Sequence, residues 1–112
     1  MSFLSRLFGG RAPSLSPAAF VAERDPAAPL LDVRTPSEFA GGHLRGAVNV
    51  DVTAPGFGER VARLGLPADA AVYVYCASGV RSGRAVGMLG AMGHAGAVNV
   101  GGYGALRAAG AE

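Results

Sequence analysis

The segment VYVYCASGVRSGR, residues 72–84, places the only cysteine of the chain between an apolar run and two arginines. Valine and tyrosine are enriched in strands, so residues 71–75 are predicted to form a buried strand. A glycine-containing loop follows Cys76, and residues 81–92 are predicted to form a helix, although each of its glycines costs roughly 1 kcal/mol relative to alanine. This strand, loop and helix put Cys76 at the carboxyl end of a strand, where sites form in α/β sheets.

Outward from this segment, short apolar runs alternate with short helical patterns. Three further strands are predicted at residues 29–33, 47–52 and 97–100. Helices are predicted from Ser16-Pro17 to about residue 24, from a Thr35/Glu38 capping box to residue 39, and over 57–66 and 103–110. The alternation predicts an α/β fold, with a mostly parallel sheet, helices on both faces and right-handed crossovers.

The composition fits one domain with an ordinary hydrophobic core. The chain has 112 residues, of which 50% are hydrophobic and 16% charged, which excludes disordered and fibrous classes. No apolar run approaches the roughly 20 residues of a membrane-spanning helix, and the start lacks the features of a secretory signal. We therefore expect a cytoplasmic protein without a membrane span.

Residues 1–12 are predicted to be an N-terminal extension and residues 13–112 the domain. The apolar residues Phe3, Leu4, Leu7 and Phe8 have helix-like spacing that ends at a glycine pair. Such a segment suits contact with a partner or a membrane surface. An isolated helix this short is marginal in water, so we expect a frayed or loosely docked end.

A lone cysteine restricts the chemistry that Cys76 can perform. No internal disulfide can form, and Cys76 with His43 and His94 supplies too few ligands for a structural zinc site. No metal and no cofactor are predicted. The thiol is therefore either a small buried hydrophobe or a reagent.

Charge is unevenly distributed along a chain whose net charge is only +2. Residues 70–111 contain no Asp or Glu but include Arg81, Arg84 and Arg107, so this part should attract anions. The chain has no lysine, and guanidinium groups suit paired contacts with oxyanions. No basic run is interleaved with aromatic residues, which disfavours nucleic acid as a partner.

The loop after Cys76 has the properties of an anion cradle. Successive backbone amides and a helix N-terminus favour negative charge, and Gly79 lets the turn bend. The same surroundings should lower the pKa of the Cys76 thiol and make it nucleophilic. Arg81 adjoins the loop and is predicted to help hold an anion, whereas Arg84 is expected on the solvated face.

Two ordered motifs resemble those of rhodanese-like sulfurtransferase domains: LLDVRTPSEFAGGHLRGAVNV, residues 30–50, and CASGVRS, residues 76–82. The resemblance covers about residues 14–106 and implies a single rhodanese-like domain with a five-stranded, mostly parallel sheet. It also implies that Cys76 accepts a sulfane sulfur from thiosulfate or a persulfide and passes it to a thiol or cyanide.

The resemblance also implies roles for individual residues of the site. Cys76 would be the catalytic nucleophile, Arg81 would orient a sulfonate, Asp32 would brace the loop by hydrogen bonds and Arg34 would pair structurally. His43 would be a buried residue that fixes a turn. The substrate-binding loop comprises Ala77, Ser78, Gly79, Val80, Arg81 and Ser82.

Two other classes of function remain open from the sequence. Phosphatases and arsenate reductases use a similar loop with five residues between Cys and Arg, whereas this chain has four. A non-catalytic or sulfur-relay module that recognises a protein partner is the other alternative. The sequence identifies neither the sulfur donor nor the acceptor, and a monomer is the expected state.

Overall fold

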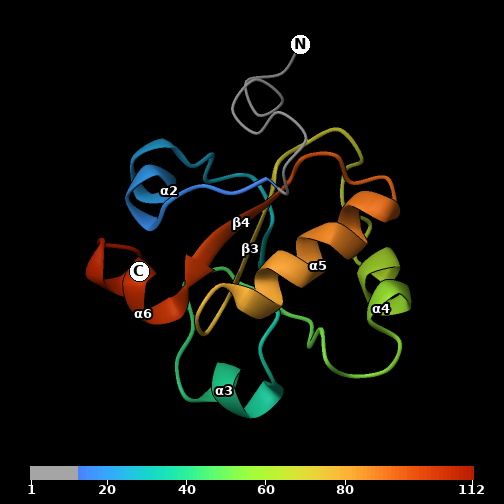
Figure 1. The fold of residues 1–112 in the computed structure, drawn as a ribbon, viewed down its shortest axis with the longest axis horizontal. Coiled ribbons are helices and arrows are strands. Elements are labelled where there is room, and N and C mark those ends of the chain that lie inside the picture. Colours follow the sequence, from blue (N-terminus) through green and yellow to red (C-terminus); the bar gives the residue numbers. More distant parts are fainter. Residues whose placement is uncertain (1–12) are drawn as a thin grey trace.

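The computed structural model describes residues 13–112, in which four strands form one parallel sheet (Figure 1). The order across the sheet is β2-β1-β3-β4, and each neighbouring pair is parallel. All four strands predicted from the sequence are confirmed. They are β1 (Leu30–Asp32), β2 (Val48–Asn49), β3 (Val72–Cys76) and β4 (Ala97–Gly102).

The fifth strand that the resemblance implies is not formed in the described part of the chain. Instead, Ser14 makes an isolated parallel bridge with Asn99 at the free edge of β4. The amide of Leu15 donates to the Asn99 carbonyl at 2.9 Å, and the Asn99 amide donates to the Pro13 carbonyl at 3.0 Å. Pro13 and Pro17 flank the bridge, and proline cannot donate to a ladder, so the pairing stops after one bridge.

Strand β2 is shorter than the predicted run of residues 47–52. The amides of Val50 and Val52 still donate to the carbonyls of Asp32 and Val33, at 2.9 and 3.2 Å, and both valines are buried. The backbone then turns away, because the Asp51 carboxylate accepts the Thr53 amide at 2.9 Å. The apolar pattern therefore reports burial correctly but overestimates the length of the strand.

Two of the described helices begin at the caps that the sequence predicts. The Ser16 hydroxyl accepts the Ala19 amide at 3.1 Å, and Thr35 and Glu38 form the predicted capping box. The helices are α2 (Pro17–Glu23), α3 (Pro36–Ala40), α4 (Phe57–Arg63), α5 (Val80–Ala91) and α6 (Tyr103–Ala108).

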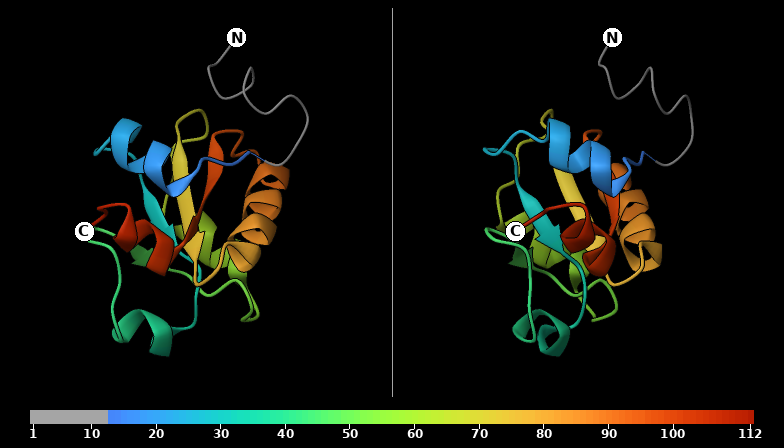
Figure 2. Two further views of the ribbon diagram at one scale, coloured as in Figure 1. Left: turned by 60° about the vertical axis from the view of Figure 1, so that its left-hand side comes forward. Right: turned by 90° about the vertical axis from the view of Figure 1, so that its left-hand side faces the viewer.

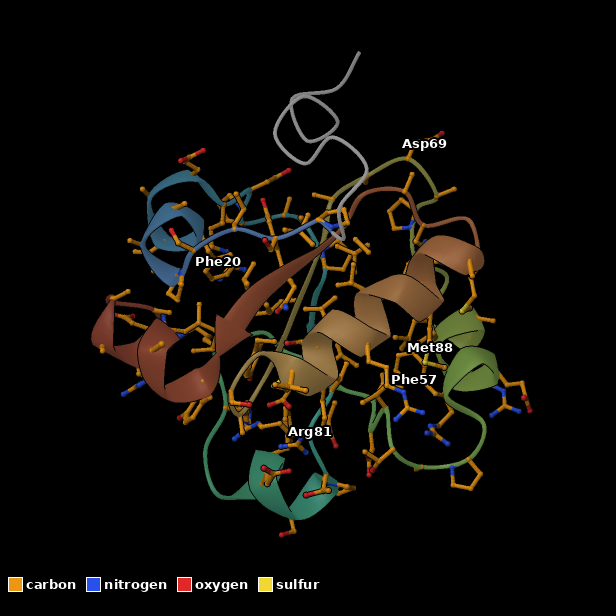
Figure 3. The ribbon with its side chains drawn as sticks, in the orientation of Figure 1. Phe20, Phe57, Asp69, Arg81 and Met88 are labelled. Atoms are coloured by element: carbon orange, nitrogen blue, oxygen red, sulfur yellow. The ribbon has the colours of Figure 1, made fainter. Side chains whose placement is uncertain are left out.

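Helices cover both faces of the sheet, as predicted (Figure 2). Alternate residues of β3 point to opposite sides, so that Val74 and Cys76 face α4 and α5, whereas Tyr73 and Tyr75 face α2 and α6. Figure 3 shows Phe57 on the side of α4 and α5. Each face therefore has its own buried cluster.

Helix α3 lies apart from these two layers, beyond the carboxyl ends of the strands (Figures 1 and 2). It is close to the turn that joins β3 to α5, and this proximity makes it part of the site described below. The predicted extension, residues 1–12, lies outside the described residues. Within residues 13–112, no helix has the length and apolarity needed to cross a membrane.

Candidate active site

Cys76 is the last residue of β3 and is completely buried. Its Sγ accepts a hydrogen bond from the Gly79 amide at 3.0 Å and lies 3.3 Å from the Ser82 hydroxyl. Gly79 is the N-cap residue of α5 and has φ 97°, a conformation that favours glycine. The loop therefore curls so that the start of α5 faces the sulfur atom.

These contacts favour the thiolate form of Cys76. Burial is the largest single influence and raises the pKa, but several hydrogen bonds oppose it. They come from the Ser82 hydroxyl and from the backbone amides of Ser82, Ser78 and Gly79, and the net result is a lowered pKa for the Cys76 thiol. The direction predicted from the sequence is confirmed, and hydrogen bonds within the loop are its main cause.

The end of β4 packs directly against the cysteine loop. A register shift between Val74 and Tyr75 of β3 sets Gly101 and Gly102 opposite Tyr75 and Cys76. A Cβ atom on Gly102 would overlap the carbonyl oxygen of Ala77, and one on Gly79 would lie 3.4 Å from the Gly101 Cα. Glycine at positions 101 and 102 therefore lets the backbone of β4 approach the backbone of the cysteine loop closely.

Asn99 joins β4 to the loop and was not identified from the sequence. Its Nδ2 donates to the Gly79 carbonyl at 2.9 Å, and its Oδ1 accepts the Gly101 amide at 3.0 Å. The same Oδ1 lies 2.7 Å from the Ser82 hydroxyl. That hydroxyl has one hydrogen and two acceptors, Asn99 Oδ1 and Cys76 Sγ, so Asn99 influences how Ser82 can stabilise the thiolate.

A signal for Asn99 is present in the sequence, because AVNV occurs at residues 47–50 and again at 97–100. In both copies the asparagine amide donates to backbone carbonyls of another segment. Asn49 Nδ2 donates to the carbonyls of Asp32 and Arg34, at 3.0 and 2.9 Å. The repeat therefore marks two strand residues that hold loops at the carboxyl edge of the sheet.

Asn99→Asp is expected to raise the pKa of Cys76 and to reduce the share of thiolate at neutral pH. The change removes the donor to Gly79 and adds negative charge near the thiolate, which disfavours ionisation. Because the thiolate is lost as pH falls through the thiol pKa, the whole pH profile should move to higher pH. A titration of the thiolate ultraviolet absorbance measures this directly, since the chain has one cysteine.

Asn49→Asp is the matched control for that titration. It makes the same chemical change at the other AVNV copy, in β2, which β1 separates from β3. The Cys76 titration should remain unchanged in this variant. An unchanged Cys76 titration in Asn99→Asp as well would show that Asn99 does not influence the thiol.

Arg81 does not point freely into the loop, because its guanidinium binds Glu38 of α3. NH1 donates to Oε1 at 2.7 Å and NH2 donates to Oε2 at 2.9 Å. Glu38 was predicted only as a capping residue, so its second role was missed. Arg84 is exposed, as expected.

Asp32 and Arg34 form a buried ion pair beside the site. The carboxylate of Asp32 accepts the Arg34 amide and binds its guanidinium, with a shortest distance of 2.7 Å. The hydrogen bonds that the Arg34 guanidinium donates to Asp32 raise the pKa of Arg34. The structural pairing of Arg34 is thus confirmed, but the Asp32 carboxylate binds Arg34 and does not brace residues 77–82 by hydrogen bonds.

This ion pair supports the site indirectly. Arg34 donates to the Gly42 carbonyl at 2.7 Å, and its guanidinium carbon lies 4.6 and 5.6 Å from the ring centroids of Tyr103 and Tyr75. Tyr75 immediately precedes Cys76, and its hydroxyl accepts the Leu44 amide at 3.0 Å. Burial raises the pKa of this tyrosine, which keeps it neutral.

His43 differs from its expected position. It is exposed and not buried, because its ring stacks on Phe39 with centroids 3.7 Å apart at the surface. Its Nδ1 lies 2.8 Å from the Phe39 carbonyl, a contact across the turn that follows α3.

The fold and the site together define an α/β domain that holds a buried cysteine at the carboxyl end of a central strand, with the amides of Ser78, Gly79 and Ser82 directed at its sulfur atom. The family model for the rhodanese-like domain matches residues 16–109. The chain therefore belongs to the rhodanese-like domain family.

One curated relative is similar to part of this chain. Uncharacterized protein YqhL of Bacillus subtilis is 45% identical over 58 residues, which are 52% of this chain and 43% of that protein. The match therefore spans less than half the length of that relative.

Solved structures show the same fold. The rhodanese-like domain of the Anabaena sp. Alr3790 protein has a TM-score of 0.74 and 27% identity, covering 88% of this chain and 76% of that one. A rhodanese with anions from E. coli has a TM-score of 0.63 and 33% identity, covering 70% of this chain and 91% of that one.

Proposed function

We propose that this protein is a rhodanese-type sulfurtransferase that carries a sulfane sulfur on Cys76 as a persulfide. The observation that carries the proposal is the environment of Cys76 Sγ, which accepts a hydrogen bond from the Gly79 amide and lies beside the Ser82 hydroxyl. These hydrogen bonds lower the pKa of the Cys76 thiol. Hydrogen bonds that lower the pKa of a thiol increase its share of the thiolate form, which is the nucleophile. The same donors suit the charge of a terminal persulfide sulfur.

The transfer takes place in two displacements with thiosulfate as donor. The Cys76 thiolate attacks the outer sulfur, a new S–S bond forms, and the S–S bond of thiosulfate breaks with its electron pair leaving on sulfite. Cyanide or an acceptor thiolate then attacks the terminal sulfur, and the Cys76 thiolate is restored. Neither displacement requires a proton from a general acid, an external oxidant or an electron carrier.

Each loop residue has a role in this proposal. The amides of Ser78, Gly79 and Ser82 stabilise the charge of the sulfur, and Ala77 and Val80 complete the loop. The Ser82 hydroxyl donates to Sγ when it does not donate to Asn99. Arg81 attracts the anionic end of the donor. Since the chain has one cysteine, an external acceptor, either a thiol or cyanide, must take the sulfur from the persulfide. A persulfide on a partner protein is an alternative donor.

The packing of the loop favours sulfur over phosphate. Four residues separate Cys76 from Arg81, one fewer than in phosphatase loops, and Gly79 and Ala77 lie in close contact with Gly101 and Gly102. A compact ring of amides suits one sulfur atom better than a tetrahedral phosphate. We therefore expect no hydrolysis of a phosphate ester. Measured hydrolysis would instead favour the phosphatase alternative.

The thiosulfate-to-cyanide assay tests the proposal, with thiocyanate as the measured product. Double-reciprocal plots at several cyanide concentrations should be parallel, because sulfite leaves before cyanide reacts. Converging lines would contradict a persulfide intermediate. Absence of turnover with thiosulfate and with low-molecular-weight persulfides would favour a partner-binding module.

A further inference from the structure

Arg81 is the cation nearest to the cysteine loop, yet a carboxylate of the same chain already occupies it. Figure 3 shows Arg81 at the start of α5, facing α3. The two contacts from its NH1 and NH2 to Glu38 run in parallel, which is the arrangement in which guanidinium groups bind oxyanions. Glu38 therefore occupies the donor pair that a sulfonate would use.

The α3 cap holds Glu38 in place for this contact. Glu38 Oε1 accepts hydrogen bonds from the amide and the hydroxyl of Thr35, both at 3.1 Å. The Glu38 amide in turn donates to the Thr35 hydroxyl at 3.2 Å. The hydrogen bond from Arg81, followed by that from Thr35, lowers the pKa of Glu38 to about 2. The carboxylate is therefore charged and correctly oriented before any donor arrives.

The pair remains accessible to a competing anion. The side chains of Arg81 and Glu38 are 28% and 34% exposed. Residues 70–111 contain no acidic residue, so Glu38 brings negative charge from a distant segment to an otherwise basic part of the chain. A dianion that approaches Arg81 must displace this carboxylate or tolerate its repulsion.

We propose that Glu38 determines donor selectivity by competing with anionic donors for the Arg81 guanidinium. The site then disfavours the dianion thiosulfate relative to donors of lower charge that transfer the same sulfur. This inference rests on the proposed sulfurtransferase function and adds to it a residue that sets the accepted substrate class. Glu38 is a specificity residue that acts through Arg81.

Glu38→Gln tests the inference, because glutamine keeps an acceptor for Thr35 and is accepted in capping boxes. The two donors are thiosulfate and the methanethiosulfonate monoanion, which both leave one sulfur on Cys76 and release sulfite or methanesulfinate. The ratio of kcat/KM for thiosulfate to that for methanethiosulfonate should rise about three- to fivefold, mainly through KM, as expected for a partly exposed ion pair. The rise should shrink at high salt.

Two further variants separate selectivity from damage to α3 or to the loop. Thr35→Ala weakens the cap of α3 at least as much as Glu38→Gln does but keeps the Glu38 carboxylate, so it should raise the donor ratio less than Glu38→Gln does. In an Arg81→Ala background, Glu38→Gln should no longer raise the ratio. An unchanged ratio in Glu38→Gln alone, or a rise that persists without Arg81, would overturn the inference.

The same experiment separates failure of this inference from failure of the proposed function. The intact mass of each variant is recorded after treatment with methanethiosulfonate. A persulfide on Cys76 with an unchanged donor ratio overturns only the role of Glu38. No persulfide in the unsubstituted protein with either donor overturns the sulfurtransferase proposal, and with it the inference about Glu38.

Discussion

Cys76→Ser is expected to reduce thiocyanate formation by more than about a thousandfold, which is the scale of losing a covalent nucleophile. A serine hydroxyl at this position is not ionised at neutral pH and cannot form a persulfide. The fold should survive, because serine is similar in size and its oxygen can accept the Gly79 amide that now donates to Sγ. Circular dichroism and cooperative thermal unfolding establish that the variant is folded.

Cys76→Ala is the companion variant, because it removes both the nucleophile and the acceptor for the Gly79 amide. Both variants should lose transfer to the same extent, while Cys76→Ala should be the less stable of the two. Substantial transfer by a folded Cys76→Ser protein would contradict the covalent mechanism.

Asp32→Ala is expected to lower the free energy of unfolding by about 3–5 kcal/mol, which is typical when one partner of a buried ion pair is removed. Asp32 is fully buried and Arg34 is 5% exposed, so the variant leaves a buried guanidinium without its carboxylate. Because domains of this kind are stable by only about 5–15 kcal/mol, the loss would be a large fraction of the total. Urea denaturation followed by circular dichroism measures it.

The double variant Asp32→Ala/Arg34→Met is the control for this loss. It removes both charges and leaves an apolar side chain between Tyr75 and Tyr103, so it should recover part of the stability. A loss below about 1 kcal/mol in Asp32→Ala, the usual range for an exposed pair, would contradict a structural role for the pair. No recovery in the double variant would mean that the carboxylate acts through groups other than Arg34.

Local patterns predicted most of the fold. The Val and Tyr run of β3, the capping signals at Ser16 and Thr35 and the glycine after Cys76 each depend on neighbouring residues, so they can be recognised without the fold. The residue patterns alone predict four strands, and the structure of residues 13–112 has four. The fifth strand came only from the resemblance, and the prolines on either side of Ser14 explain why a single bridge replaces it.

The parts of the site that the sequence did not reveal depend on contacts between distant residues. Glu38 and Arg81 are 43 positions apart, and Ser82 and Asn99 are 17 apart. The capping pattern already explained the presence of Glu38, so there was no reason in the sequence to expect its contact with Arg81. Such contacts follow only once the crossovers have brought α3, α5 and β4 to the same edge of the sheet.

The register of β4 against β3 could not be predicted from the sequence either. Its register shift sets Gly101 opposite Tyr75, and a regular alternation of buried and exposed residues does not reveal a bulge. Because the shift brings Gly102 against Ala77, the shape of the cysteine loop depends on a strand that follows it by some twenty residues.

The most direct test of the account is the intact mass of the protein after incubation with thiosulfate, followed by washing with a thiol reductant. The proposed mechanism predicts a gain of one sulfur atom per chain, absent from Cys76→Ser and removed by the reductant. No gain in mass with thiosulfate, methanethiosulfonate or a low-molecular-weight persulfide would contradict the claim that Cys76 carries sulfur.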